Sequence, residues 1–93
     1  MKSVLVVDDK DENLYLLQVL LTHQGYRVST ARHGAEALTM ARQSPPDLLV
    51  TDILMPVMDA FALCRQWKSD AQLKHIPLIF YTATYTDARA ERF

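Results

Sequence analysis

Apolar residues along the chain follow two alternating patterns. Short runs, such as residues 4–7, are continuously aliphatic, and the stretches between the runs carry apolar residues every three or four positions. The first pattern is typical of buried strands, and the second of helices with one apolar face. We therefore predict strands over residues 3–7, 26–30, 47–51 and 76–81, and helices over residues 11–23, 34–43, 59–69 and 87–93.

Strands that alternate with helices of about ten residues predict a parallel sheet with helices on both faces, because right-handed crossovers place the helices there. The expected fold class is α/β, a doubly wound parallel sheet in one domain, residues 1–93. The aliphatic run at residues 3–7 indicates a central strand that is covered on both faces.

Local signals predict where the helices begin and end. Asp11 or Asn13 is the expected N-cap of the first helix, and Gly25 lies where a glycine commonly ends one. Pro45 and Pro46 should end the second helix, because neither can donate a backbone hydrogen bond. In the first helix the apolar residues at helical spacing are Leu14, Leu17, Leu20 and Leu21. In the second, Ala37, Leu38 and Ala41 are expected to face the sheet. The third carries Phe61, Leu63, Cys64 and Trp67, of which Phe61 and Trp67 are expected in the core or at a partly buried surface and Cys64 in the core.

Composition and charge exclude several classes of protein. The net charge is −1 and the ten basic residues are scattered, so we expect no direct contact with nucleic acid or a membrane surface. No apolar run has the length of a membrane span, and the N-terminus lacks the layout of a signal peptide. The single cysteine, Cys64, cannot form an internal disulfide, which fits a cytoplasmic location.

Three carboxylates, those of Asp8, Asp9 and Asp52, follow the first and third predicted strands. Ligands of open α/β sheets bind beyond the carboxyl ends of the strands, so neighbouring strands would bring the three together there. Such carboxylates repel one another unless a cation neutralises them, and Mg²⁺ is a hard ion that prefers oxygen ligands. A carboxylate beside such an ion can act as a nucleophile and form an aspartyl phosphate. Thr82 follows the fourth strand and offers a hydroxyl to a phosphoryl group on Asp52.

The order of these motifs resembles the receiver domain of two-component response regulators. The resemblance rests on Asp8-Asp9, Asp52, Met55-Pro56-Val57-Met58-Asp59 and Thr82-Ala83, and also on Gly25-Tyr26-Arg27-Val28 and Gly34-Ala35-Glu36-Ala37-Leu38. It covers essentially the whole chain. It implies a flavodoxin-like sheet of order 2-1-3-4-5 and a signalling domain rather than a turnover enzyme.

The resemblance also implies roles for individual residues. Asp52 would be the phosphoacceptor, supplied by a histidine kinase or a histidine phosphotransfer protein. Asp9 would be the main ligand of Mg²⁺ (or Mn²⁺), with Asp8 acting largely through water and Asp52 and the backbone carbonyl of Leu54 completing the metal site. The remaining family positions are the switch residue Thr82 with its neighbour Ala83, which contact the phosphate, and the loop residues Met55 and Pro56.

The chain departs from the family pattern in two ways. Ala60 replaces a glycine that usually follows the Met-Pro-x-Met-Asp motif, and the family's fifth strand, with its lysine and aromatic switch partner, would lie beyond Phe93. We therefore expect a receiver shortened before its fifth strand and last helix, with order 2-1-3-4. Lys74 cannot replace the lysine, because it precedes the fourth strand. That strand would be an exposed edge, which predicts dimerisation through it, strand exchange or low solubility.

Other functions remain open at this point. A phosphorylation-deficient pseudo-receiver, acting as a protein-interaction module, would fit the missing lysine. An aspartyl-phosphate hydrolase needs a general acid two residues after the nucleophile. This chain has Leu54 there, which cannot transfer a proton, so that function is disfavoured. A flavodoxin-type cofactor role is disfavoured by the acidic loop after the first strand.

Simpler structural roles are the alternatives for single residues. Asp8 or Asp9 alone would serve as a helix cap. The three histidines, His23, His33 and His75, show no metal-binding spacing and are expected at the surface.

Overall fold

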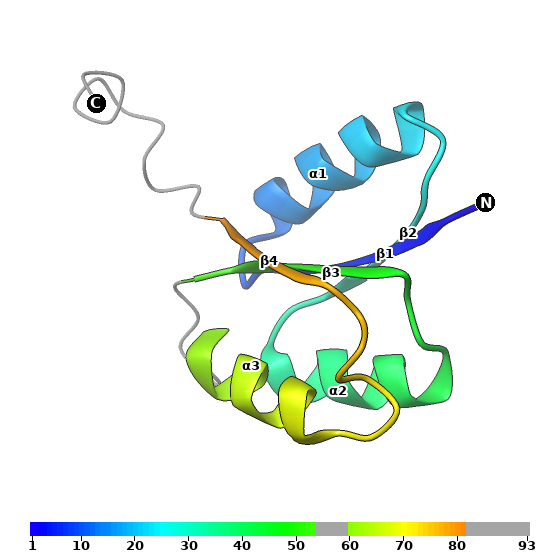
Figure 1. Cartoon of the computed structure of the whole chain (residues 1–93). Helices are drawn as coiled ribbons and strands as arrows, with labels where there is room; N and C mark the ends of the chain where they lie inside the picture. The colour runs from blue at the N-terminus through cyan, green and yellow to red at the C-terminus, as the bar shows by residue number, and fades with distance from the viewer. Residues whose placement is uncertain (54–59, 82–93) are drawn as a thin grey trace, which may run out of the picture.

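The computed structural model describes residues 1–53 and 60–81, which form strands and helices in the predicted alternating order (Figure 1). The strands are β1 (Ser3–Val7), β2 (Arg27–Ala31), β3 (Leu48–Asp52) and β4 (Leu78–Tyr81). The helices are α1 (Asp11–His23), α2 (Gly34–Gln43) and α3 (Ala60–Ser69). The helix predicted over residues 87–93, and Asp59 as the first residue of the third helix, lie outside the described residues.

The four strands are parallel and lie in the order β2-β1-β3-β4. Helix α1 covers one face of this sheet, and α2 and α3 cover the other (Figure 1). Residues 4–7 of β1 are at most 2% exposed, as expected of a central strand that is packed on both faces. The predicted α/β class and the 2-1-3-4 order are confirmed.

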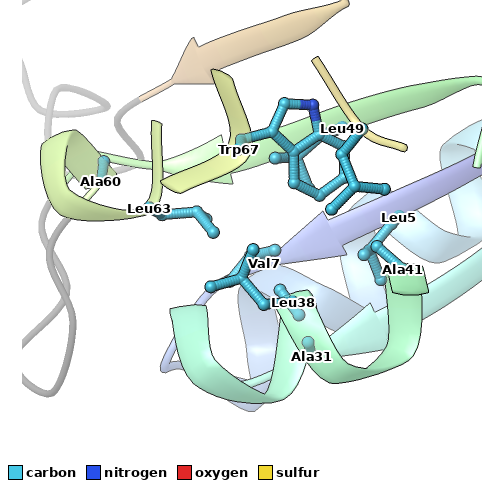
Figure 2. Packing of buried hydrophobic residues seen from close by; sticks show 11 residues of the cluster. Leu5, Val7, Ala31, Leu38, Ala41, Leu49, Ala60, Leu63 and Trp67 are labelled. Atoms are coloured by element: carbon cyan, nitrogen blue, oxygen red, sulfur yellow. The ribbon is translucent and has the colours of Figure 1, made fainter. Parts of the chain in front are cut away.

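The larger part of the core lies between the sheet and helices α2 and α3 (Figure 2). Trp67 of α3 is its largest fully buried side chain, and its indole N–H donates to the carbonyl oxygen of Ile76 at 3.1 Å. That bond satisfies the one polar atom that the ring brings into the core. The other buried members of this cluster are Leu5, Val7, Ala31, Ala37, Leu38, Ala41, Leu49, Ala60, Leu63 and Leu73.

A smaller cluster lies under α1, where Leu14 packs with residues of β1. Leu17 and Leu21 are partly buried against it, but Leu20 is 53% exposed. Leu20 falls beside the stripe formed by Leu14, Leu17 and Leu21, and one helix face contacts only a narrow strip of sheet.

Helix α3 likewise buries only part of its predicted apolar set. Leu63 and Trp67 are fully buried, whereas Phe61 is 55% exposed and Cys64 is partly buried. Phe61 packs its ring beside that of Phe80, with centroids 5.7 Å apart, at the margin of the core. Phe61 is therefore more exposed than the expected core or partly buried position, although its ring still contacts that of Phe80.

The ends of the helices follow the predicted local signals only in part. Gly25 has φ +95° directly after α1, as predicted for the glycine that ends that helix. Neither Asp11 nor Asn13 is the N-cap of α1: the cap residue is Lys10, which makes no side-chain capping bond. His33 was expected simply at the surface, yet its Nδ1 accepts the backbone N–H of Glu36 and caps α2.

Strand boundaries moved by one or two residues. β2 begins at Arg27 rather than Tyr26 and ends at Ala31, and β4 begins at Leu78, after Pro77. Within the described ranges the longest helix has 13 residues, and none is long and apolar enough to cross a bilayer.

Candidate functional site

The sheet topology brings the three predicted carboxylates together. β1 and β3 are neighbours with Val7 paired to Thr51, so Asp8 and Asp9 after β1 lie beside Asp52 at the end of β3. One carboxylate oxygen from each residue lies within 4.8 Å of the others. This was the predicted arrangement, at the carboxyl edge of a parallel sheet.

Asp8 is fully buried, and both of its oxygens accept hydrogen bonds. Its Oδ1 accepts the backbone N–H of Lys10 at 2.9 Å. Its Oδ2 accepts the side-chain amide of Asn13 at 3.0 Å and the hydroxyl of Tyr81 at 2.5 Å. These donors stabilise a carboxylate that is shielded from bulk solvent.

Asp9 is bonded differently. Its side chain is partly buried, and its Oδ1 is enclosed with no hydrogen-bond partner among residues 1–53 and 60–81. Burying a carboxylate oxygen without a hydrogen-bond donor costs free energy unless a positively charged group lies beside it. The three neighbouring negative charges add to this cost, so the donor set fits a hard divalent cation.

Tyr81 is the site residue that sequence reasoning missed. It ends β4, and burial, together with its bond to Asp8 and the charges of Asp8, Asp52 and Asp9, raises the pKa of its hydroxyl well above the usual value. Like any tyrosine hydroxyl at neutral pH, it is protonated and acts as a donor. The available signal was its place at the C-terminal end of a strand, next to Thr82.

Several predicted site residues lie outside the described residues. They are Leu54, Met55, Pro56, Thr82 and Ala83. Lys74, by contrast, is described, and it precedes β4, at the end of the strand opposite to Tyr81 and Asp52. It cannot reach the carboxylates, as expected.

The simpler explanation of the first two carboxylates as helix caps is only partly correct. Asp8 accepts the N–H of Lys10, the N-cap residue of α1, so it does support the start of that helix. In the described part of the chain Asp9 makes no capping bond, and its enclosed Oδ1 has no donor nearby. Helix capping therefore leaves the convergence of the three carboxylates unexplained.

Comparison with known proteins decides the family. A sequence profile of the response regulator receiver domain matches residues 4–93. The chain belongs to this family. Receiver domains are signalling domains rather than classical enzymes, and they generally bind Mg²⁺ through an acidic pocket; this chain has such an aspartate cluster. They interact with histidine kinases or phosphotransfer proteins.

Two relatives show the extent of the sequence similarity. The receiver is 45% identical over 89 residues to the response regulator PleD of Caulobacter vibrioides, covering 96% of this chain and 19% of PleD. It is 37% identical over 91 residues to the polar-differentiation response regulator DivK of Brucella anthropi, covering 98% of this chain and 74% of DivK. The chain thus spans about a fifth of the length of PleD.

Solved structures agree with the fold. The N-terminal domain of a response regulator receiver protein from Methanoculleus marisnigri has a TM-score of 0.86 at 32% identity, with 99% of this chain and 75% of that chain covered. The chemotaxis protein CheY4 of Vibrio cholerae also has a TM-score of 0.86, at 33% identity, with 99% and 76% covered. The receiver therefore has the flavodoxin-like architecture that its motifs predicted.

Proposed function

We propose that this receiver accepts a phosphoryl group on Asp52 from a histidine kinase or a histidine phosphotransfer protein. The observation that carries the proposal is the meeting of Asp52 with Asp8 and Asp9, with one oxygen of each within 4.8 Å of the others. Asp52 is 2% exposed at the end of β3, so its carboxylate is held by the sheet rather than by a flexible loop. Family membership supports a phosphorelay role, and the geometry supports this residue as its acceptor.

The metal site would be formed mainly by Asp9 and Asp52. The enclosed Oδ1 of Asp9 supports its role as the main direct ligand. Asp8, whose oxygens already accept three hydrogen bonds, would act largely through water, and the backbone carbonyl of Leu54 would add a further oxygen. When bound, Mg²⁺ or Mn²⁺ supplies positive charge that offsets the carboxylates and an incoming phosphate.

The transfer itself exchanges one bond for another. A carboxylate oxygen of Asp52 attacks the phosphorus, a P–O bond to Asp52 forms, and the P–N bond to the donor histidine breaks. The histidine nitrogen keeps the electron pair of the broken bond. Thr82 and Ala83 would contact the phosphoryl group, and the loop containing Met55 and Pro56 would border it. The output would be a change in protein contacts at this edge of the sheet.

A phosphorylation assay tests this proposal against a pseudo-receiver that only binds partners. The protein is incubated with a small acyl-phosphate donor, with Mg²⁺ or with a chelator, and its intact mass is measured. Wild type should gain one phosphoryl group only when Mg²⁺ is present. Asp52→Asn should gain none, whereas Asp47→Asn, which removes a carboxylate near the opposite end of β3, should react as wild type does.

Failure of the wild type to gain mass, in protein shown to be folded by circular dichroism, would contradict the proposal. That result would favour the pseudo-receiver. A gain that persists in the Asp52→Asn protein would place the acceptor elsewhere.

We also propose that copies of this chain associate through β4. Among the described strands β4 is an edge, paired only with β3, and its Ile79 is 50% exposed. An edge strand with an apolar side chain is a template for pairing with a second chain.

A further inference from the structure

Tyr81 connects the end of β4 to the carboxylate cluster. Its hydroxyl donates to Oδ2 of Asp8 at 2.5 Å, although the two residues are 73 positions apart in sequence. We propose that Tyr81 is a positioning residue of the metal site, one that fixes the carboxylate of Asp8 for cation binding. This inference rests on the proposed function, because it assigns a further residue to the same site.

The hydrogen bonds of Asp8 show what the hydroxyl accomplishes. A carboxylate has about four acceptor positions, two on each oxygen. Oδ2 receives donors from both Asn13 and Tyr81, and Oδ1 receives one, from the N–H of Lys10. Among the described residues, the remaining position is the second one on Oδ1. Tyr81 therefore engages one oxygen and leaves the other for a cation or for a water bound to it.

Without the hydroxyl, Asp8 would lose this arrangement. Asn13 alone would hold Oδ2, and the carboxylate would rotate more freely about its terminal torsion, which has no sharp preference. Removing the donor also leaves a fully buried negative charge less well compensated. Hydrogen-bond partners of metal ligands matter for this reason, and their loss typically reduces metal affinity by roughly 10- to 100-fold.

Position within the sheet gives Tyr81 a second connection to the site. Its Cα pairs in register with that of Asp52, so the residue lies beside the proposed acceptor while its side chain reaches Asp8. It thereby joins the ends of β1, β3 and β4. A tyrosine hydroxyl is protonated at neutral pH, so Tyr81 can act as the donor in this bond.

The test compares Tyr81→Phe with Tyr15→Phe, which removes a hydroxyl from a side chain on α1 that is 70% exposed. Mg²⁺ affinity is measured by calorimetry on protein whose fold is verified by circular dichroism. Tyr81→Phe should raise the Kd for Mg²⁺ about tenfold, the lower end of the expected range because Asn13 and Lys10 still donate to Asp8. Tyr15→Phe should leave the Kd unchanged. A folded Tyr81→Phe protein that binds Mg²⁺ as tightly as wild type would overturn the inference.

A second measurement needs no variant and reports on Tyr81 directly. The protein is labelled with ¹³C at the ζ carbon of tyrosine and titrated with Mg²⁺ in an NMR experiment. The Tyr81 resonance should shift with the calorimetric Kd, while that of Tyr15 stays in place. An unmoved Tyr81 resonance would count against a positioning role, even if Tyr81→Phe fails to fold.

The two proposals fail in different ways. Mg²⁺-dependent phosphorylation of wild type, together with unchanged metal affinity in Tyr81→Phe, would remove only the role of Tyr81. Absence of any Mg²⁺ binding by wild type would remove both.

Discussion

Asp52 and Tyr81 are register partners, the last residues of β3 and β4 respectively. From this shared level Tyr81 reaches across to Asp8, which follows β1. Three strands therefore end at one place and deliver their polar residues to it. The site is a consequence of the parallel 2-1-3-4 order, because only parallel neighbours bring their carboxyl ends to the same edge.

Mg²⁺ should stabilise the fold, because the proposed site exists only in the native state and a bound cation would relieve the repulsion among its carboxylates. At ten times its Kd a ligand contributes about 1.4 kcal/mol, which corresponds to a rise in Tm of roughly 5–10 °C for a domain of this size. Thermal unfolding with MgCl₂, compared with NaCl at equal ionic strength, measures the effect. Asp9→Asn should be more stable than wild type without metal and should lose the response to Mg²⁺. An equal response in wild type and Asp9→Asn would contradict the assignment of Asp9.

Trp67 should be the most sensitive position of the larger core cluster. Trp67→Phe removes buried ring volume and leaves the carbonyl of Ile76 without the indole N–H that it accepts. The expected loss in the free energy of unfolding is about 2 kcal/mol. Urea denaturation measures it, with Gln66→Ala, an exposed position on the same helix, as the control expected to stay within about 0.5 kcal/mol. Equal losses in the two variants would show that the indole contributes nothing specific.

Asp47 should make stability depend on acidic pH at the end of the sheet away from the site. The pKa of its carboxyl is lowered from 3.8, chiefly because it accepts the backbone N–H of Ser3 at 2.7 Å. A depressed folded-state pKa gives stability that is present above the unfolded pKa and lost as pH falls through the folded value. Asp47→Asn should therefore be less stable than wild type at neutral pH, and the difference should shrink below about pH 4. Urea unfolding across this range measures it, and a pH-independent difference would rule out the charged hydrogen bond as its source.

The exposed β4 edge should drive self-association of the wild type as concentration rises. Ile79→Lys places a charge on that edge and should shift the protein toward monomer. Val19→Lys makes a comparable change on α1, where the side chain is 46% exposed, and should leave association unchanged. Light scattering over a wide concentration range distinguishes these outcomes. A wild type that stays monomeric throughout would show that β4 does not pair.

Much of this architecture could be predicted because the relevant signals are local. The aliphatic run of β1, the glycine after α1 and the alternation of strands and helices each depend on neighbours in sequence. The convergence of Asp8, Asp9 and Asp52 needed only the further assumption that β1 and β3 are adjacent.

The missed features escaped the sequence analysis for different physical reasons. Tyr81 contacts Asp8, which lies 73 residues earlier in the chain. In the sequence alone, Tyr81 is therefore indistinguishable from any other strand residue. The cap on α2 uses the ring nitrogen of His33, although histidine is not among the preferred capping residues. Leu20 is exposed because α1 presents only one narrow stripe to the sheet.

The identity of the residue that carries the phosphoryl group is the most direct test of the account. After phosphorylation in the presence of Mg²⁺, borohydride reduction converts an aspartyl phosphate to homoserine, which tandem mass spectrometry locates in the digested protein. The account predicts homoserine at position 52 and unmodified aspartate at positions 8 and 9. Homoserine at position 8 or 9, or at none of the three, would contradict it.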